Sequence, residues 1–215
     1  MQKQNNPVEL LKEAICLLQK HSCSYALSGG FAASLYRQEP RLTQDVDFTL
    51  VAKNITEAQK IATTVQSSLN LSSGKLTEAL LIKAPQMNKK QSPVMSLAGR
   101  TKDKLSGVDF LFETFPWAKI GVERALNVNF KFAIIPTLTA EDLLISKAYT
   151  MTFHQVRYKD LDDFEQIAIN QEIKLDYIYL AQQFEQLKLC IPRDLEKKVP
   201  KQISRISRAI RKATS

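Results

Sequence analysis

The sequence predicts a mixed α/β (α+β) fold, in which a small sheet flanked by helices is followed by a C-terminal helical portion. Short apolar runs rich in β-branched and aromatic residues predict strands, and longer runs with apolar residues at helical spacing predict helices. A length of 215 residues suits one domain, or one domain with a small helical appendage. We expect a core over residues 1–136 and a helical portion over 137–215, which could be continuous with the core.

The N-terminal region predicts an amphipathic helix that begins at Pro7 and is capped by Asn6. The start of the chain lacks an apolar signal core, and no window approaches 18 uncharged apolar residues, so we expect no membrane partner. Cys16, Cys23 and Cys190 lack the spacing of a metal site. We expect them to be reduced, buried thiols of a cytoplasmic protein.

A glycine-containing turn follows. Residues 23–27 predict a short buried strand and residues 31–36 predict a helix, with Ser28, Gly29 and Gly30 between them. A helix N-terminus offers unpaired N–H groups, and glycine lets a phosphate approach the backbone closely. The turn is therefore a candidate phosphate site, although Gly-Gly between a strand and a helix is often only a tight turn. It matches neither the P-loop nor the dinucleotide pattern.

Two carboxylates lie in the strand predicted over residues 45–51. Asp45 and Asp47 are two positions apart and therefore share a face, with their Cα atoms about 6–7 Å apart. Mutual repulsion and lost hydration make such a pair unfavourable in a core unless a cation compensates. Mg²⁺ prefers oxygen ligands of this kind together with phosphates and water. The alternative is a solvated edge strand with two surface acids, and the flanking apolar residues favour the metal site because they predict that the opposite face is buried.

These two motifs resemble those of a known superfamily. Residues 28–30 (Ser-Gly-Gly) followed by residues 45–48 (Asp-Val-Asp-Phe) resemble the signature of the DNA polymerase β-like nucleotidyltransferases. Here Ser28 stands where an apolar residue is usual, and the spacer over residues 31–44 is slightly long. Residues 41–47 are most similar to the bacterial abortive-infection (AbiEii-like) nucleotidyltransferases, a branch that includes toxins, and are also similar to some aminoglycoside nucleotidyltransferases. The resemblance implies a polymerase β-like core.

The resemblance implies a third carboxylate on a neighbouring strand. Residues 106–113 predict an apolar strand with Asp109 embedded early, and Glu113 on the same face is the reserve candidate. A turn-capping role is the alternative for Asp109. The preceding segment, residues 86–106, is polar and rich in basic residues, Arg100 among them, and predicts a loop or hairpin near the site.

The resemblance also implies nucleotide contacts in the C-terminal portion. Lys147 interrupts the apolar run of a helix predicted over residues 140–152, and related proteins carry a lysine there that faces the triphosphate. A lysine that extends to solvent from a partly buried helix is the commoner explanation. In the segment over residues 157–163, Lys159 and Asp160 are candidate site residues, or they cap the helix expected to begin there.

The resemblance therefore implies an enzyme that uses Mg²⁺ or Mn²⁺ and moves a nucleoside monophosphate from a nucleoside triphosphate to an acceptor hydroxyl. The implied catalytic and metal-binding residues are Asp45, Asp47 and Asp109. The implied nucleotide-binding residues are Ser28, Gly29, Gly30, Arg41, Thr43, Lys147 and Asp160. The toxin branch implies RNA, such as tRNA, or a protein as acceptor, and an antitoxin as partner. The alternatives are a small-molecule, aminoglycoside-type nucleotidyltransferase and a non-catalytic nucleic-acid- or protein-binding member of the fold.

The net charge of +8 is concentrated at the C-terminal end. After Glu196 there is no acid, so seven basic residues leave only +1 for residues 1–196. Pro200 predicts the start of a helix with basic residues on one face and isoleucines on the other. We expect the apolar stripe to dock on the domain and the basic tail, residues 197–215, to face solvent or an RNA backbone. The basic residues are Lys197, Lys198, Lys201, Arg205, Arg208, Arg211 and Lys212.

Overall fold

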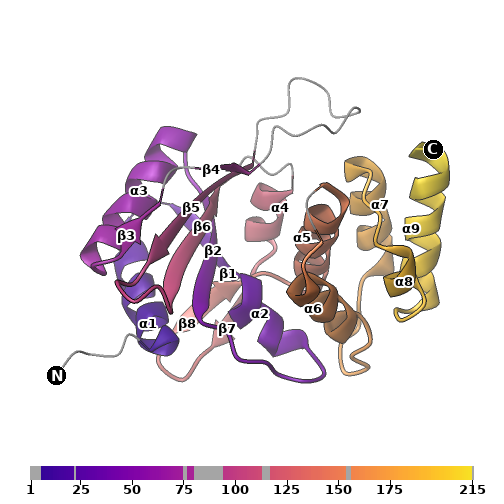
Figure 1. Ribbon diagram of the computed structural model, residues 1–215, viewed down its shortest axis with the longest axis horizontal. Coiled ribbons are helices and arrows are strands. Elements are labelled where there is room, and N and C mark those ends of the chain that lie inside the picture. The colour runs from indigo at the N-terminus through magenta and orange to yellow at the C-terminus, as the bar shows by residue number, and fades with distance from the viewer. Residues whose placement is uncertain are drawn as a thin grey trace. The chain divides into compact units, whose positions relative to one another are not determined.

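The computed structural model of the chain describes residues 6–21, 23–74, 77–79, 94–112, 117–153 and 156–214. Strands and helices are mixed up to residue 138, and the regular structure described beyond it is helical (Figure 1). The strands are β1 Ser24–Ser28, β2 Asp45–Val51, β3 Ser72–Ser73, β4 Thr77–Ala79, β5 Val94–Arg100, β6 Gly107–Phe112, β7 Leu126–Asn129 and β8 Ile134–Thr137. The helices are α1 Pro7–Leu18, α2 Gly29–Tyr36, α3 Ile55–Ser68, α4 Ala118–Glu123, α5 Ala140–Phe153, α6 Tyr158–Ala168, α7 Tyr177–Leu187, α8 Arg193–Glu196 and α9 Lys201–Thr214. The predicted mixed α/β fold is therefore confirmed.

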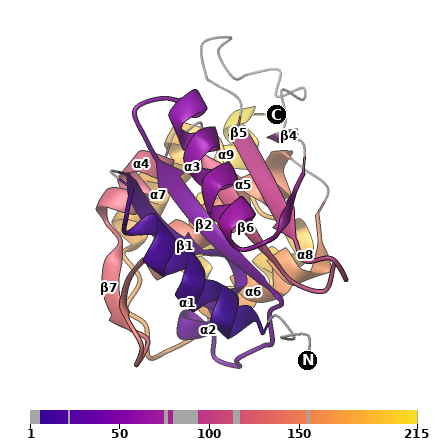
Figure 2. The ribbon, with the colours of Figure 1, turned by 90° about the vertical axis from the view of Figure 1, so that its left-hand side faces the viewer.

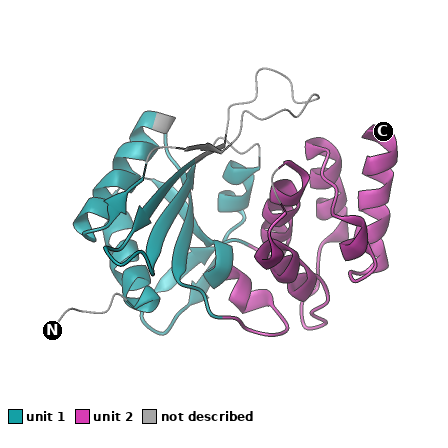
Figure 3. Cartoon of the chain, viewed as in Figure 1, with its two compact units in different colours: residues 1–31, 42–138 teal, residues 32–41, 139–215 magenta. Residues whose placement is uncertain are grey.

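The contacts divide the chain into two compact units (Figure 3). Unit 1 comprises residues 1–31 and 42–138 and contains the sheet, and unit 2 comprises residues 32–41 and 139–215 and is helical. The division expected at residue 136 differs from this one in one main respect, since residues 32–41 group with unit 2. The boundary therefore falls inside α2, just after the glycines of the predicted phosphate site.

The strands of unit 1 form one mixed sheet in the order β3-β5-β6-β2-β1-β8-β7, and β4 pairs with β5. Strands β2 and β6 are parallel, as are β1 and β8, whereas the other neighbouring pairs are antiparallel. Helix α1 contacts β2 and β6, α3 contacts β5 and β6, and both helices lie over one face of the sheet (Figure 2).

Strand β2 lies inside the sheet, between β1 and β6, so the alternative of a solvated edge strand is wrong. Its apolar side chains and those of β6 form a fully buried face, and the rings of Phe48 and Phe110 stack with their centroids 5.7 Å apart. Because side chains alternate along a strand, the carboxylates of β2 lie on the opposite face. The six side chains that are 0% exposed are Val46, Phe48, Leu50, Val108, Phe110 and Phe112.

Local capping explains where several helices begin. Pro7 occupies the first turn of α1, and the side chain of Asn6 accepts a hydrogen bond from Val8 N at 2.9 Å, as predicted. In the same way Asn54 accepts from Glu57 N at 2.9 Å at the start of α3. These bonds satisfy backbone donors that have no partner within the helix.

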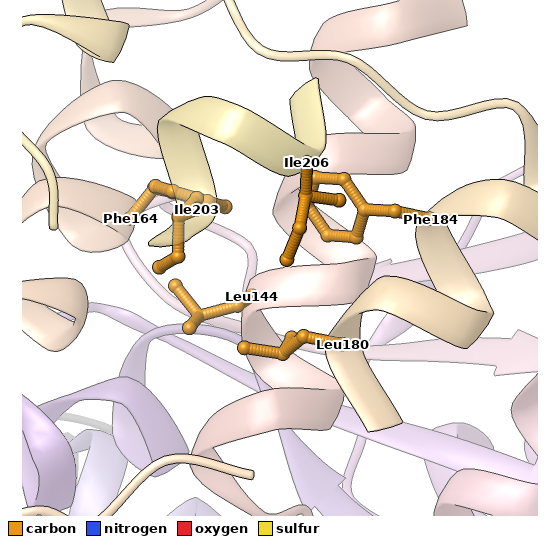
Figure 4. Close-up of a pocket in the computed structure, with 6 residues that line it drawn as sticks. All are labelled: Leu144, Phe164, Leu180, Phe184, Ile203 and Ile206. Carbon is orange, nitrogen blue, oxygen red and sulfur yellow. The ribbon is translucent and has the colours of Figure 1, made fainter. Parts of the chain in front are cut away.

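Helix α9 begins directly after Pro200, as the sequence predicted. Ile203 is 1% exposed, and with Ile206 it packs against apolar side chains of α5, α6 and α7 (Figure 4). The expected docking of the isoleucine stripe is therefore confirmed within unit 2. The other side chains of this cluster are Leu144, Phe164, Leu180 and Phe184.

No helix in the described part of the chain combines the length and the apolar character that a membrane span requires. The three cysteines are free thiols, but their expected burial is wrong. Cys16 is exposed because it lies away from the side of α1 that carries the buried leucines, and Cys23 and Cys190 are half-buried.

Replacing Ile203 by alanine is expected to lower the free energy of unfolding by about 2–4 kcal/mol, because it leaves a cavity between α9 and its neighbours. The control is Ile178→Ala, since this isoleucine belongs to the same unit and is 74% exposed. We expect the control to change stability by less than about 0.5 kcal/mol. Urea unfolding of both variants measures the difference, and equal losses would contradict the docking of α9.

Candidate active site

The register of four adjacent strands brings the predicted carboxylates together. Ser28 of β1 pairs with Asp47 of β2, Asp47 pairs with Asp109 of β6, and Asp109 pairs with Ala98 of β5. Residues directly opposite in a sheet point to the same face. The hydroxyl and two carboxylates therefore form a row across β1, β2 and β6.

A second row lies two residue pairs further along, which is the next position on the same face. Asp45 of β2 pairs with Gly107 of β6, and Gly107 pairs with Arg100 of β5. Asp45 and Asp109 are thus diagonal neighbours on one face, which is half-open to solvent: 35% of the Asp45 side chain and 25% of the Asp109 side chain are exposed. The sheet places all three predicted carboxylates on this face.

The glycine turn packs directly on the Asp47 carboxylate. Gly29 has φ +59°, and a Cβ atom there would lie 1.9 Å from Asp47 Oδ2, so no other residue fits without movement. Gly30 N donates a hydrogen bond to the same oxygen at 3.4 Å. The sequence analysis predicted that this amide donates a hydrogen bond to a phosphate. In the structure it donates to the Asp47 carboxylate.

Ser28, at the end of β1, is 3% exposed, and its hydroxyl has no hydrogen-bond partner among the described residues. Buried hydroxyls are rarely left without a partner, so this one is open to an atom from outside the chain, such as an oxygen of water or of a ligand. The hydroxyl lies beside the Asp47 carboxylate and the N-terminus of α2. A phosphate oxygen suits this position, since the hydroxyl donates and the helix end attracts anions.

Arg100 is a cation at the site that the sequence analysis did not assign. Its two terminal nitrogens donate hydrogen bonds to both oxygens of Asp109, Nη2 to Oδ2 at 2.9 Å and Nη1 to Oδ1. Nη2 also lies 3.9 Å from Asp45 Oδ2. The hydrogen bond to Asp109 raises the pKa of Arg100, and the charges of the carboxylates add to the effect although partial burial opposes it.

The donor set suits a hard divalent cation, because Asp45, Asp47 and Asp109 supply carboxylate oxygens on one face. Within the ranges that the structure describes, no three His, Cys, Asp or Glu side chains converge closely enough to form a metal site. The third carboxylate, that of Asp109, is hydrogen-bonded to Arg100. Glu113, the reserve candidate, lies outside the described residues.

The predicted nucleotide residues from the C-terminal portion gather in a separate cluster within unit 2. Asp163 has a fully buried side chain and accepts hydrogen bonds from Arg37 Nη1 and Arg41 Nε, both at 2.7 Å. Lys147 Nζ lies 2.9 Å from the same carboxylate and donates to Asp160 at 2.8 Å. The cluster thus pairs buried carboxylates with several cations, as buried charges require.

Two alternatives for this region can now be decided. Lys147 is 8% exposed and ends on carboxylates, so it does not extend to solvent. Asp160 lies in the first turn of α6, but its side chain accepts from Lys147 and Arg157 at 2.8 and 2.6 Å. As a nucleotide contact each remains a prediction, as does Arg41. Thr43, in unit 1, donates a hydrogen bond to the Asp45 carbonyl at 3.2 Å.

Sequence reasoning assigned no role to Arg37 or Asp163, and it placed Arg100 only in a basic segment near the site, without a partner among the carboxylates. Asp163 stood in a segment that the family resemblance had already singled out, and its buried position on α6 follows the helical spacing of Phe164 and Ile167. That signal could have marked it as a buried acid in need of cations. Arg37 and Arg100 carry no local signal, because their partners lie 126 and 9 residues away along the chain.

Acid should weaken unit 2 through Asp163. Burial alone would raise its pKa, but hydrogen bonds from Arg41 and the charge of Lys147 lower it to about 2. A lowered pKa adds stability that is present above about pH 4 and is lost as pH falls toward 2, on the order of 2 kcal/mol. Urea unfolding at pH 2–5 should show that Asp163→Asn lacks this contribution, whereas Asp194→Asn, at a carboxylate of the same unit that is 92% exposed, keeps it. Equal pH slopes in the two variants would refute this.

A family model and several solved structures match the chain, whereas no curated protein does. It is similar to JHP933 from Helicobacter pylori (17% identity, 87% of this chain and 75% of that chain, TM-score 0.46). It is also similar to the antibiotic-resistance factor ANT(2'')-Ia (14% identity, 84% of this chain and 88% of that chain, TM-score 0.47). A third similar structure is an antigenic nucleotidyltransferase-like protein from Paracoccidioides brasiliensis (15% identity, 94% of this chain and 93% of that chain, TM-score 0.47). The family model "Nucleotidyl transferase AbiEii toxin, Type IV TA system" matches residues 10–210. The chain therefore belongs to the AbiEii nucleotidyltransferase toxin family.

Proposed function

We propose that this nucleotidyltransferase moves a nucleoside monophosphate from a nucleoside triphosphate to an acceptor hydroxyl, with Mg²⁺ or Mn²⁺ held by Asp45, Asp47 and Asp109. The observation that carries the proposal is the row of Ser28, Asp47 and Asp109 on one half-open face of the sheet. Three carboxylates on one face add nothing to the stability of the fold, whereas a metal-dependent transfer needs them as ligands.

Each group of the row has a role in this proposal. Ser28 Oγ donates to a phosphate oxygen, and the N-terminus of α2 attracts the phosphate charge. Gly30 N keeps the Asp47 carboxylate in place. A divalent cation, when bound, stabilises charge on the attacking and leaving oxygens of an in-line displacement. Asp109 assists removal of the acceptor proton.

Arg41, Thr43, Lys147 and Asp160 are proposed as nucleotide contacts on the family resemblance. An ammonium group has three N–H donors. Two carboxylates, those of Asp160 and Asp163, face the ammonium of Lys147 in this structure. A phosphate oxygen would be a third partner for Lys147 and would help neutralise the pyrophosphate that leaves.

RNA is the acceptor that the charge distribution favours. Glu196 pairs with Arg208 and Arg211 and is almost fully buried, so it neutralises part of the tail. The basic face of α9 is then carried by Lys201, Arg205 and Lys212, all exposed. A stripe of cations on an otherwise nearly neutral chain suits a phosphate backbone better than a cationic small molecule. The family further supports a role as a toxin with an antitoxin partner, and we place the protein in the cytoplasm.

The transfer itself is tested with each α-³²P-labelled nucleoside triphosphate, Mg²⁺ and total bacterial RNA. We expect label to move into RNA, and Asp45→Asn or Asp47→Asn to lower the rate at least about 100-fold, because the metal loses a ligand. Asp194→Asn, a change of the same kind at a side chain that is 92% exposed, should leave the rate unchanged.

Three other outcomes are informative. Label that enters protein or an aminoglycoside instead would change the acceptor and keep the enzyme. Equal labelling by wild type and both site variants would remove these carboxylates from the mechanism. Absence of both transfer and Mg²⁺-dependent triphosphate binding would leave a non-catalytic binding protein.

The basic face of α9 is tested by substitution, since removing residues 197–215 would uncover the apolar cluster beneath Ile203. Changing Lys201, Arg205 and Lys212 together to Gln should weaken RNA binding about tenfold or more at ~0.1 M salt and reduce the salt slope by about 2. The control removes the same charge from three exposed lysines of unit 1, Lys20, Lys53 and Lys60. If both triple variants bind RNA alike in a filter-binding titration, α9 is not the contact surface.

A further inference from the structure

The candidate site already contains a cation, the guanidinium of Arg100. It donates hydrogen bonds to both oxygens of Asp109 and lies 3.9 Å from an oxygen of Asp45. A divalent metal needs the same lone pairs, since Mg²⁺ binds carboxylate oxygens at about 2.0–2.1 Å. The guanidinium and the metal therefore cannot both hold Asp109 in the same way.

The local structure is built to let Arg100 reach this position. Arg100 pairs with Gly107, and Asp109 lies two residues further along the same face of β6. A Cβ atom at Gly107 would lie 2.5 Å from Arg100 Nη1 and 3.1 Å from its Cδ. The arginine side chain thus crosses β6 over Gly107, where no side chain stands in its way.

The arginine is also placed so that it can leave. Its side chain is 34% exposed, and the side-chain partners found for its guanidinium are the carboxylates of the site. Its other hydrogen bond goes to the carbonyl of Gly99, next to it in the chain, at 3.1 Å. A partly exposed ion pair is weak enough to be exchanged for a stronger ligand.

We propose that Arg100 is an internal counter-ion that holds Asp109 while no metal is bound and releases it when a divalent cation binds. The inference rests on the proposed metal-dependent function. Arg100 acts through Asp109 and is therefore a positioning residue. While it is paired it relieves the repulsion between the carboxylates, and its competition lowers the affinity for metal alone. A triphosphate that arrives with the metal offers the released guanidinium new oxygen partners.

The test is a titration of the full chain with Mn²⁺ alone, in which electron paramagnetic resonance measures free Mn²⁺. We expect Arg100→Gln to bind Mn²⁺ about fivefold or more tightly than wild type, because the competing cation is gone. Arg100→Lys should be intermediate, since an ammonium cannot hold both oxygens of Asp109. The control is Lys102→Gln, which removes one charge from an exposed side chain of the same β5–β6 connection and should change affinity less than about twofold.

A double-mutant cycle separates direct competition from a general effect of charge. If Arg100 acts through Asp109, Arg100→Gln should no longer raise affinity in the Asp109→Asn background. Circular dichroism and thermal unfolding without metal check that each variant folds, and Arg100→Lys keeps the test usable if Arg100→Gln does not.

The outcomes distinguish the inference from the function on which it rests. Mn²⁺ binding that is equal or weaker in Arg100→Gln overturns the counter-ion role and leaves the metal site in place. Absence of Mn²⁺ binding in wild type and in every Arg100 variant overturns the metal site as well. A gain that persists in the Asp109→Asn background would mean that Arg100 acts as a remote charge and not through Asp109.

Discussion

The central constraint on unit 1 is that β2 must bury one face completely while it carries two carboxylates on the other. Its apolar side chains are fully buried with those of β6, so the register of these parallel strands is fixed by packing. Once that register is set, Asp47 lies beside Asp109 and Asp45 lies beside Gly107. A slip by one residue would send both acids into the core. The geometry of the candidate site is thus a consequence of hydrophobic packing behind it.

The close approach of the glycine turn depends on the same register. Ser28 pairs with Asp47, and the next residue, Gly29, adopts a positive φ that leaves no room for a Cβ beside that carboxylate. The start of α2 is therefore held against the acidic row by backbone geometry. This explains why a serine, two glycines and an Asp pair 15 residues away form one motif: each is needed for the others to fit.

Local signals in the sequence were sufficient to predict many of the helices and strands and two of the carboxylates of the candidate site. The start of α1, capped by Asn6, the start of α9 after Pro200 and the strand over residues 45–51 follow from spacing and composition. The place of Asp109 on a neighbouring strand follows from the family resemblance. What local signals could not supply is pairing between distant residues. That Arg100 would cross Gly107, or that Arg37 would meet Asp163, depends on strand register and helix packing that no short window encodes. The exposure of Cys16 was missed because free cysteine is usually buried, and this general tendency was followed although the helical spacing of the apolar residues of α1 puts Cys16 on the other side.

Both units compensate their carboxylates with arginine or lysine, but to different degrees. In unit 2 the side chain of Asp163 is fully buried and three cations hold it, so losing one of them would leave a buried charge less fully compensated. In unit 1 the carboxylates are half-open and one arginine holds the third of them. A buried, fully satisfied network gives rigidity, whereas a half-open pair can be exchanged for a stronger cation at little cost. The difference in burial is therefore the physical reason why Asp163 holds its cluster rigidly, and why we propose that only the half-open ion pair of unit 1 exchanges its cation.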